Sequence, residues 1–213
     1  MAQGWLLHQK ALMGISESPM DDLRQAHQMA VNALEKNPDH AMLLALASTL
    51  EGMFGNFDAS CARAEKLESL AREINEIVMT AETQRQCGKY KKSIETYEKA
   101  FRISPHYSSW IKQHYTYALL QNGDLEAAKK YALEQSVHEH LSTGGNESFH
   151  AMLAYIYHKE GEESLSKEHF EKQKTMKNRR TKQMIITNFS SVRSKVFMND
   201  YIKVLQSLGM PDQ

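Results

Sequence analysis

The fold is decided by one stretch of the chain, Gly88-Lys89-Tyr90-Lys91-Lys92-Ser93-Ile94-Glu95-Thr96-Tyr97-Glu98-Lys99-Ala100, with Pro105 shortly after it. A glycine at this place is typical of a helix end, because it adopts the turn that other residues avoid. Ser93, Tyr97 and Ala100 then recur at intervals of four and three, which places them on one face of a second helix. Pro105 ends that helix, because the residue before a proline avoids the helical region. The stretch therefore predicts a helical hairpin.

The same pattern recurs around three further glycines. Gly55, Gly88, Gly123 and Gly161 are spaced by 33, 35 and 38 residues. Seven residues before each glycine stands a small residue, and five residues after it stands another; the pairs are Ser48 and Ser60, Ala81 and Ser93, Thr116 and Ala128, and Ala154 and Ser166. An earlier set with the same internal spacing is Ala26, Ala30, Ala33 and Pro38. Small residues on facing helices let the two axes approach closely, so we expect each pair to be in contact.

This repeat resembles the tetratricopeptide-repeat (TPR) family over roughly residues 5 to 175. The resemblance implies an all-α fold, a right-handed superhelical array of about five TPR-like helical hairpins plus a C-terminal capping helix. One hairpin cannot bury its apolar face alone, so neighbours must stack and the last one needs a cap. We expect residues 1–178 to form the array and residues 179–213 to form a linker and the capping helix, with Tyr201, Val204, Leu205 and Leu208 as its apolar stripe.

The ending adds a narrower resemblance. Phe189-Ser190-Ser191-Val192, the predicted last helix and then Leu208-Gly209-Met210-Pro211 resemble the close of TPR regions that follow class III adenylate cyclase domains in bacteria. Related regions follow DNA-binding domains in bacterial regulators. The resemblance implies that the chain is the regulatory or sensory C-terminal part of a bacterial signalling protein; a free-standing TPR adaptor is the alternative.

Composition restricts the classes of function further. The formal net charge is zero, so bulk charge selects neither nucleic acid nor a membrane surface. The N-terminus lacks the pattern of a signal peptide and no run of residues is long and apolar enough for a membrane span, so we expect a cytoplasmic protein. Cys61 and Cys87 form no Cys-x-x-Cys pair and imply no disulfide framework; we interpret both as small packing residues.

No motif of an enzyme is present. The chain has no phosphate-binding loop, no nucleophile elbow and no His-Glu-x-x-His. His138-Glu139-His140 offers two metal ligands one residue apart, and the sequence specifies no third. We therefore expect no catalysis, no cofactor and no metal.

The first helix of each pair lines the concave groove in the TPR family, and the helical register assigns residues to that face. The predicted partner-binding set is Asn75, Glu82, Arg85, Trp110, Gln113, Tyr117, Tyr155 and His158. Aromatic residues on a concave surface often anchor a bound peptide; the alternative is that Trp110 and Tyr117 pack between hairpins. We expect a protein or peptide partner there, or self-association as a homodimer.

A basic run at residues 172–182 leaves one further alternative. Lys172, Lys174, Lys177, Arg179, Arg180 and Lys182 would suit an acidic surface or nucleic-acid phosphates. The same cations also suit a solvated helix end, where they complement the helix dipole. We favour the helix end, and retain a nucleic-acid-associated module as the alternative function.

Overall fold

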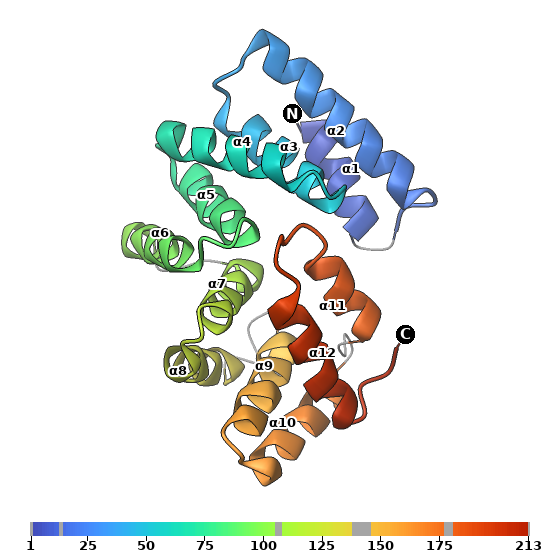
Figure 1. Ribbon diagram of the computed structural model, residues 1–213, viewed down its shortest axis with the longest axis vertical. Coiled ribbons are helices and arrows are strands. Elements are labelled where there is room, and N and C mark those ends of the chain that lie inside the picture. The colour runs from blue at the N-terminus through green and yellow to red at the C-terminus, as the bar shows by residue number, and fades with distance from the viewer. Residues whose placement is uncertain (1, 13–14, 105–107, 138–145, 177–180, 213) are drawn as a thin grey trace. The chain divides into compact units, whose positions relative to one another are not determined.

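The structure, a computed structural model, describes residues 2–12, 15–104, 108–137, 146–176 and 181–212, and these residues form helices without any strand. Figure 1 shows the helices in chain order. They are α1 (Ala2–Leu12), α2 (Pro19–Lys36), α3 (Ala41–Met53), α4 (Phe57–Leu70), α5 (Ile74–Gln86), α6 (Tyr90–Ile103), α7 (Ser109–Gln121), α8 (Leu125–Ser136), α9 (Asn146–Lys159), α10 (Glu163–Thr175), α11 (Lys182–Asn188) and α12 (Val196–Ser207). The predicted all-α fold of five helical hairpins and a final helix is confirmed.

The contacts divide the chain into two compact units. Unit 1 consists of residues 1–103 together with 190–194, and unit 2 of residues 104–189 together with 195–213. The sequence predicted a boundary near residue 178, where the repeat pattern ends. The division into two units by contacts follows a different criterion from the end of the repeat pattern, so the predicted boundary stays a prediction.

The four glycines that organise the repeat all adopt the same left-handed turn. Their φ angles are 82° at Gly55, 80° at Gly88, 83° at Gly123 and 82° at Gly161. At Gly88 the amide donates to the Arg85 carbonyl at 3.0 Å, and the next amide, of Lys89, donates to the Gln84 carbonyl at 2.9 Å. This pair of bonds is the Schellman motif, which satisfies carbonyl groups that a helix end leaves free.

Three of the four predicted small pairs meet across their hairpins. The Ser93 hydroxyl donates to the Ala81 carbonyl at 2.7 Å, and Ser166 donates to the Ala154 carbonyl at 2.8 Å. Ser48 donates in the same way to the Ser60 carbonyl at 2.8 Å. All of these residues are fully or almost fully buried. The close approach of the paired helices therefore rests on side chains small enough to let one helix touch the backbone of the other.

The first hairpin has a longer connection between its helices than the other hairpins with described connections. α1 ends at Leu12 and α2 begins at Pro19, which stands in the first turn after the N-cap Ser18. Gly4 brings α1 close to α3, because a Cβ on Gly4 would lie 3.0 Å from the Leu46 side chain. The core of unit 1 is built here, around the buried leucines and alanines of α2 and α3.

The C-terminal region holds one helix that the sequence did not predict. Helix α11 is short, and its N-cap Thr181 accepts a hydrogen bond from the Met184 amide at 3.3 Å. Helix α12 then packs on α9 and buries Tyr201, Val204 and Leu205. The predicted capping helix and three members of its apolar stripe are therefore present in unit 2.

Candidate functional site

The predicted partner-binding residues lie on three helices. Asn75, Glu82 and Arg85 are on α5 in unit 1, whereas Trp110, Gln113 and Tyr117 on α7 and Tyr155 and His158 on α9 belong to unit 2. Their exposure separates them into two groups. Asn75, Trp110 and His158 are exposed, and the remaining five are buried.

Glu82 and Arg85 form a buried ion pair. Their side chains are 5% and 1% exposed, and Arg85 Nη2 lies 2.6 Å from Glu82 Oε1. Arg85 Nε donates to Glu82 Oε2 at 2.9 Å, and the Tyr97 hydroxyl of α6 donates to the same oxygen at 2.9 Å. Burial, followed by the negative charge of Glu82, raises the pKa of Tyr97 well above its usual value. A buried charge must be paired in this way. Glu82 binds Arg85 within α5 and Tyr97 of α6, so it holds the two helices together. The sequence predicted that Glu82 and Arg85 are open to a partner, whereas the structure buries both.

Tyr117 and Tyr155 are covered by the chain's own C-terminal rings. The Tyr117 ring lies edge-on to Phe189 with centroids 4.8 Å apart, and Tyr155 lies edge-on to Tyr201 at 5.3 Å. Phe197 lies within 6.3 Å of Tyr117 and 5.5 Å of Tyr155. The sequence predicted an open aromatic face here; the structure buries it, because these rings of α7 and α9 supply the apolar surface on which the cap packs.

A polar contact closes the edge of this aromatic cluster. The Tyr155 hydroxyl donates to Asp200 Oδ2 at 2.7 Å, and Lys159 Nζ lies 2.9 Å from the same oxygen. Burial and then the hydrogen bond to Asp200 raise the pKa of Tyr155. Burial acts to raise the pKa of Asp200, but the Tyr155 and Lys159 hydrogen bonds outweigh it, and that pKa is lowered. These bonds tie α9 to α12.

Trp110 is the one aromatic residue of the predicted set that remains open. It is 44% exposed at the start of α7, and its ring lies edge-on to His114 with centroids 5.6 Å apart. Gln113, one turn further along α7, is buried. On α9, His158 lines a hollow of about 490 Å³ with Lys159, Asp200 and Lys203.

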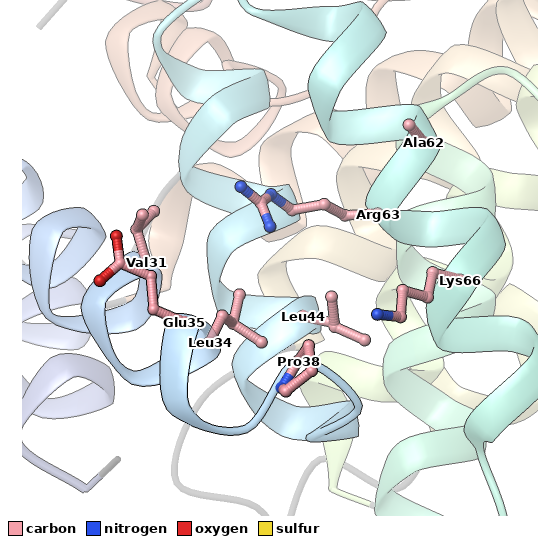
Figure 2. Close-up of a pocket in the computed structure, with 8 residues that line it drawn as sticks. All are labelled: Val31, Leu34, Glu35, Pro38, Leu44, Ala62, Arg63 and Lys66. Atoms are coloured by element: carbon pink, nitrogen blue, oxygen red, sulfur yellow. The ribbon is translucent and has the colours of Figure 1, made fainter.

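A second hollow, of about 410 Å³, lies in unit 1 (Figure 2). Val31, Leu34 and Glu35 of α2 line one side, and Ala62, Arg63 and Lys66 of α4 line the other. Arg63 is bound to Glu51 at 2.8 Å and Lys66 to Asp39 at 2.9 Å. Leu44 of α3 and Pro38 complete the lining, and none of the predicted partner-binding residues belongs to it.

The basic run is engaged wherever the structure describes it. Lys172 pairs with Glu168 at 2.8 Å, Lys174 with Glu171 at 3.0 Å and Lys182 with Asp212 at 3.3 Å. Lys177, Arg179 and Arg180 lie outside the described residues, as do His138, Glu139 and His140. The described contacts therefore give no support to the nucleic-acid alternative.

The two cysteines are joined to each other, which corrects their interpretation as packing residues. A disulfide links Cys61 of α4 to Cys87, the residue after α5, with Cα atoms 5.6 Å apart. The two residues are separated by 26 positions, and spacing in the sequence alone does not reveal such a pair. The pairing depends on how α4 stacks against α5, which only packing decides.

The sequence analysis also missed a pair of buried histidines. His150 Nδ1 of α9 lies 2.9 Å from His169 Nδ1 of α10, and the Tyr157 ring stacks on His169 at 5.4 Å. The helical register contained the signal, because His150 stands one turn before Ala154 and His169 one turn after Ser166. Within the described ranges, no group of three or more histidine, cysteine or acidic residues is arranged to hold a metal ion.

None of the described helices combines the length and the apolar character that crossing a bilayer requires.

No curated protein sequence matches the chain significantly. The family model of the tetratricopeptide repeat matches residues 78–107, which include most of α5 and all of α6. Sequence similarity thus identifies the same hairpin from which the fold was predicted.

The solved structures that resemble this chain over most of its length include two that illustrate the match. A tetratricopeptide repeat protein from Parabacteroides merdae is 15% identical, with a TM-score of 0.58, and the match covers 94% of this chain and 70% of that one. PilW, a widely conserved type IV pilus biogenesis factor, is 14% identical, with a TM-score of 0.63, and the match covers 96% and 92%. Similarity at this level of identity concerns the fold. The chain therefore contains a tetratricopeptide repeat at residues 78–107 and has the fold of tetratricopeptide-repeat proteins.

Proposed function

We propose that the chain is a non-catalytic module that binds another protein or a peptide, with Trp110 as an anchor in unit 2. The observation that carries this proposal is the exposure of Trp110, 44% of whose surface is open although Tyr117 and Tyr155 of the predicted set are buried. Tryptophan is among the residues that contribute most to binding when a partner covers them. His114 supports the ring from behind, edge-on at 5.6 Å.

The test is a comparison of two truncations in unit 2. Trp110→Ala removes the exposed anchor, whereas Val196→Ala shortens a side chain that is more exposed still, at 78%. Proteins captured from native cells by the wild-type chain should be lost from Trp110→Ala by tenfold or more and be retained by Val196→Ala, as measured by quantitative mass spectrometry. Equal capture by all three chains would reject Trp110 as the anchor.

The molar mass of the purified chain in solution distinguishes self-association from binding to a different protein. Light scattering of the purified chain across a range of concentrations reports whether a homodimer forms. A dimer that Trp110→Ala dissociates would make a second copy of the chain the partner. A monomeric wild-type chain that still captures other proteins supports a different protein as the partner.

The regulatory role in a bacterial signalling protein is also part of the proposal. It is supported by the resemblance of the ending Leu208-Gly209-Met210-Pro211 to TPR regions that follow cyclase domains. The reading frame of the native gene tests it, because a cyclase or DNA-binding domain should precede this chain. We propose a cytoplasmic location as well, although the Cys61–Cys87 disulfide favours an oxidising compartment, where such bonds persist. Free Cys61 and Cys87 thiols in intact cells would support the cytoplasmic location, and an intact disulfide there would contradict it.

A further inference from the structure

A five-residue segment from late in the chain is part of unit 1. The segment consists of residues 190–194, Ser190-Ser191-Val192-Arg193-Ser194. It packs in unit 1 with helices α1 to α6, although a long stretch of chain separates it from Ile103, where the rest of that unit ends. Val192 is completely buried and Ser191 is nearly so. The segment belongs to neither of its flanking helices, α11 and α12. It therefore docks on unit 1 much as a separate peptide would.

The main chain of the segment makes two close approaches to helix ends. The Arg193 amide donates to the carbonyl oxygen of Gln86, the last residue of α5, at 2.8 Å. Carbonyl groups in the last turn of a helix have no partner within the helix, so they are ready acceptors for another chain. At the end of α3, a Cβ on Gly52 would lie only 2.7 Å from the Ser191 carbonyl oxygen.

Gly52 is therefore required by the close approach of the backbone of the segment. A glycine within a helix is unfavourable compared with alanine, because it loses more conformational freedom on folding. Its place in the last turn of α3 is explained by the Ser191 backbone, which leaves no room for even one methyl group. Gly52 thus accommodates the main chain at position 191, where the Ser191 residue is itself nearly buried and leaves space for a small side chain.

The charges of this surface suit an arginine. Arg193 Nη2 lies 3.2 Å from Asp58 Oδ1 in the first turn of α4. The C-terminal end of α5, where the Arg193 amide binds, carries the negative end of the helix dipole. The arginine and Asp58 side chains are both largely open to solvent, 54% and 93% exposed. The ion pair therefore favours a cation at this position by only a small amount of binding free energy.

The disulfide braces the two sides of the same surface. Cys87 directly follows Gln86, and Cys61 lies one turn after Asp58 on α4. The covalent link therefore holds the acceptor carbonyl of α5 and the carboxylate of α4 at a fixed separation. Binding groups fixed in advance by rigid elements lose less freedom when a ligand binds.

We propose that Gly52, Asp58 and Gln86 form a binding site for an extended partner peptide in which a small residue, a valine-sized apolar residue and an arginine follow one another, and that residues 191–193 occupy this site in the resting chain. A partner that presents such a sequence competes with the chain's own segment. The contacts that hold residues 191–193 include the buried side chains of Ser191 and Val192, the backbone hydrogen bond of Arg193 and an exposed ion pair, and a peptide that offers the same groups can replace them. This site goes beyond the proposed function, since it uses different residues from Trp110 and lies in the other unit.

The test uses a fluorescent peptide with the sequence of residues 188–196 and the full chain. Arg193→Pro in the chain removes the donated amide and should release the resident segment. Arg193→Ala keeps that amide and removes only the exposed ion pair, so it is the matched control. By fluorescence anisotropy, the Arg193→Pro chain should bind the peptide at least tenfold more tightly than the wild-type chain. The Arg193→Ala chain should stay within threefold of wild type.

A second change tests the shape of the site. Adding Gly52→Ala to the Arg193→Pro chain should weaken peptide binding at least tenfold, and a peptide with proline in place of its arginine should fail to bind any chain. Equal peptide binding by the wild-type and Arg193→Pro chains, or binding that Gly52→Ala leaves unchanged, would overturn the proposal. Neither result bears on capture through Trp110.

Hydrogen exchange keeps the proposal testable if Arg193→Pro fails to fold. In the otherwise wild-type chain, Gly52→Ala should speed exchange of the Arg193 amide at least tenfold, because the new methyl group displaces Ser191. Excess peptide should have the same effect on the wild-type chain. If the Arg193 amide hydrogen exchanges at the same rate in all three samples, residues 191–193 do not occupy the site as proposed, and the peptide does not displace them.

Discussion

Individual buried polar residues determine where this chain is sensitive to its surroundings. Glu82 and Arg85 neutralise each other, and the Tyr97 hydroxyl donates a hydrogen bond to the Glu82 carboxylate at 2.9 Å. His150 and His169 share one hydrogen bond between their Nδ1 atoms, so one ring must donate and the other must accept. One of the two rings must therefore keep its Nδ1 atom unprotonated to accept this bond, and acid protonates that atom.

His169 makes the stability of unit 2 depend on pH. Burial, followed by the charges of His150 and Lys172, lowers the pKa of His169 to about 4 in the folded chain. In the unfolded chain the His169 side chain has its ordinary pKa of 6.5. The unfolded state therefore binds the proton more readily, and stability falls as pH falls from about 6.5 to about 4. The loss is complete only below pH 4 and amounts to about 2–3 kcal/mol, because solvent screens part of the interaction. Chemical denaturation at pH 7 and pH 4.5 measures it.

Two variants on the same hairpin isolate this effect. His169→Phe removes the titrating group and keeps a ring for Tyr157 to stack on, so its unfolding free energy should change less between the two pH values. His158→Gln changes a residue that is exposed on α9 and should leave the pH dependence as in the wild-type chain. An unchanged pH dependence in His169→Phe would show that other groups control it.

At the scale of the elements, the hairpins are joined in two different ways. Within a hairpin, a small side chain meets the facing backbone, as Ser93 meets the Ala81 carbonyl. Between hairpins, α4 and α5 are linked by the Cys61–Cys87 disulfide. The first contact depends on residues that are close in sequence, and the second restricts the unfolded chain over a longer loop.

The disulfide should stabilise unit 1 measurably. A link between residues 26 positions apart removes loop freedom from the unfolded chain worth about 3 kcal/mol. Reducing the wild-type chain should lower its unfolding free energy by about that amount, as measured by denaturant titration. The double variant Cys61→Ala, Cys87→Ala should be equally weakened and insensitive to reductant. Two free thiols in the untreated wild-type chain would contradict the link.

At the scale of the molecule, each unit is completed by residues from the end of the chain. Unit 1 includes residues 190–194, and in unit 2 the rings of Phe189, Phe197 and Tyr201 cover Tyr117 and Tyr155. A helical array leaves apolar surface at its last hairpin, and this surface must be covered. The C-terminal region therefore contributes to the folding of both units, which is more than a terminal cap requires.

Tyr201 tests the contribution of the cap to unit 2. The residue is completely buried and contacts the rings of Tyr117 and Tyr155. Tyr201→Ala should lower the unfolding free energy by about 3–5 kcal/mol, because it leaves a cavity among aromatic rings. Lys203→Ala, on the exposed side of α12, should change it by less than about 0.5 kcal/mol. Thermal and denaturant unfolding measure both, and equal stability of the two variants would refute the capping role.

The predictions for the candidate site show the limit of reasoning from helical register. Register placed Trp110, Tyr117 and Tyr155 on the first helices of their hairpins, where the structure has them. Register could not show that distant rings cover Tyr117 and Tyr155, or that Arg85 folds back on Glu82. Of the eight predicted residues, the exposed Asn75, Trp110 and His158 are those that water reaches, and whether a partner binds them stays a prediction.

The sequence by itself determined the hairpins, because each depends on residues only about a dozen positions apart. Gly88 needs its left-handed turn and Ser93 needs its place opposite Ala81 wherever the rest of the chain lies. Which surfaces stay open, which cysteines pair and which distant segment fills each site depend instead on the packing of the folded chain. Those outcomes depend on close packing between residues far apart in the chain, and such contacts leave no periodic signal in a single sequence.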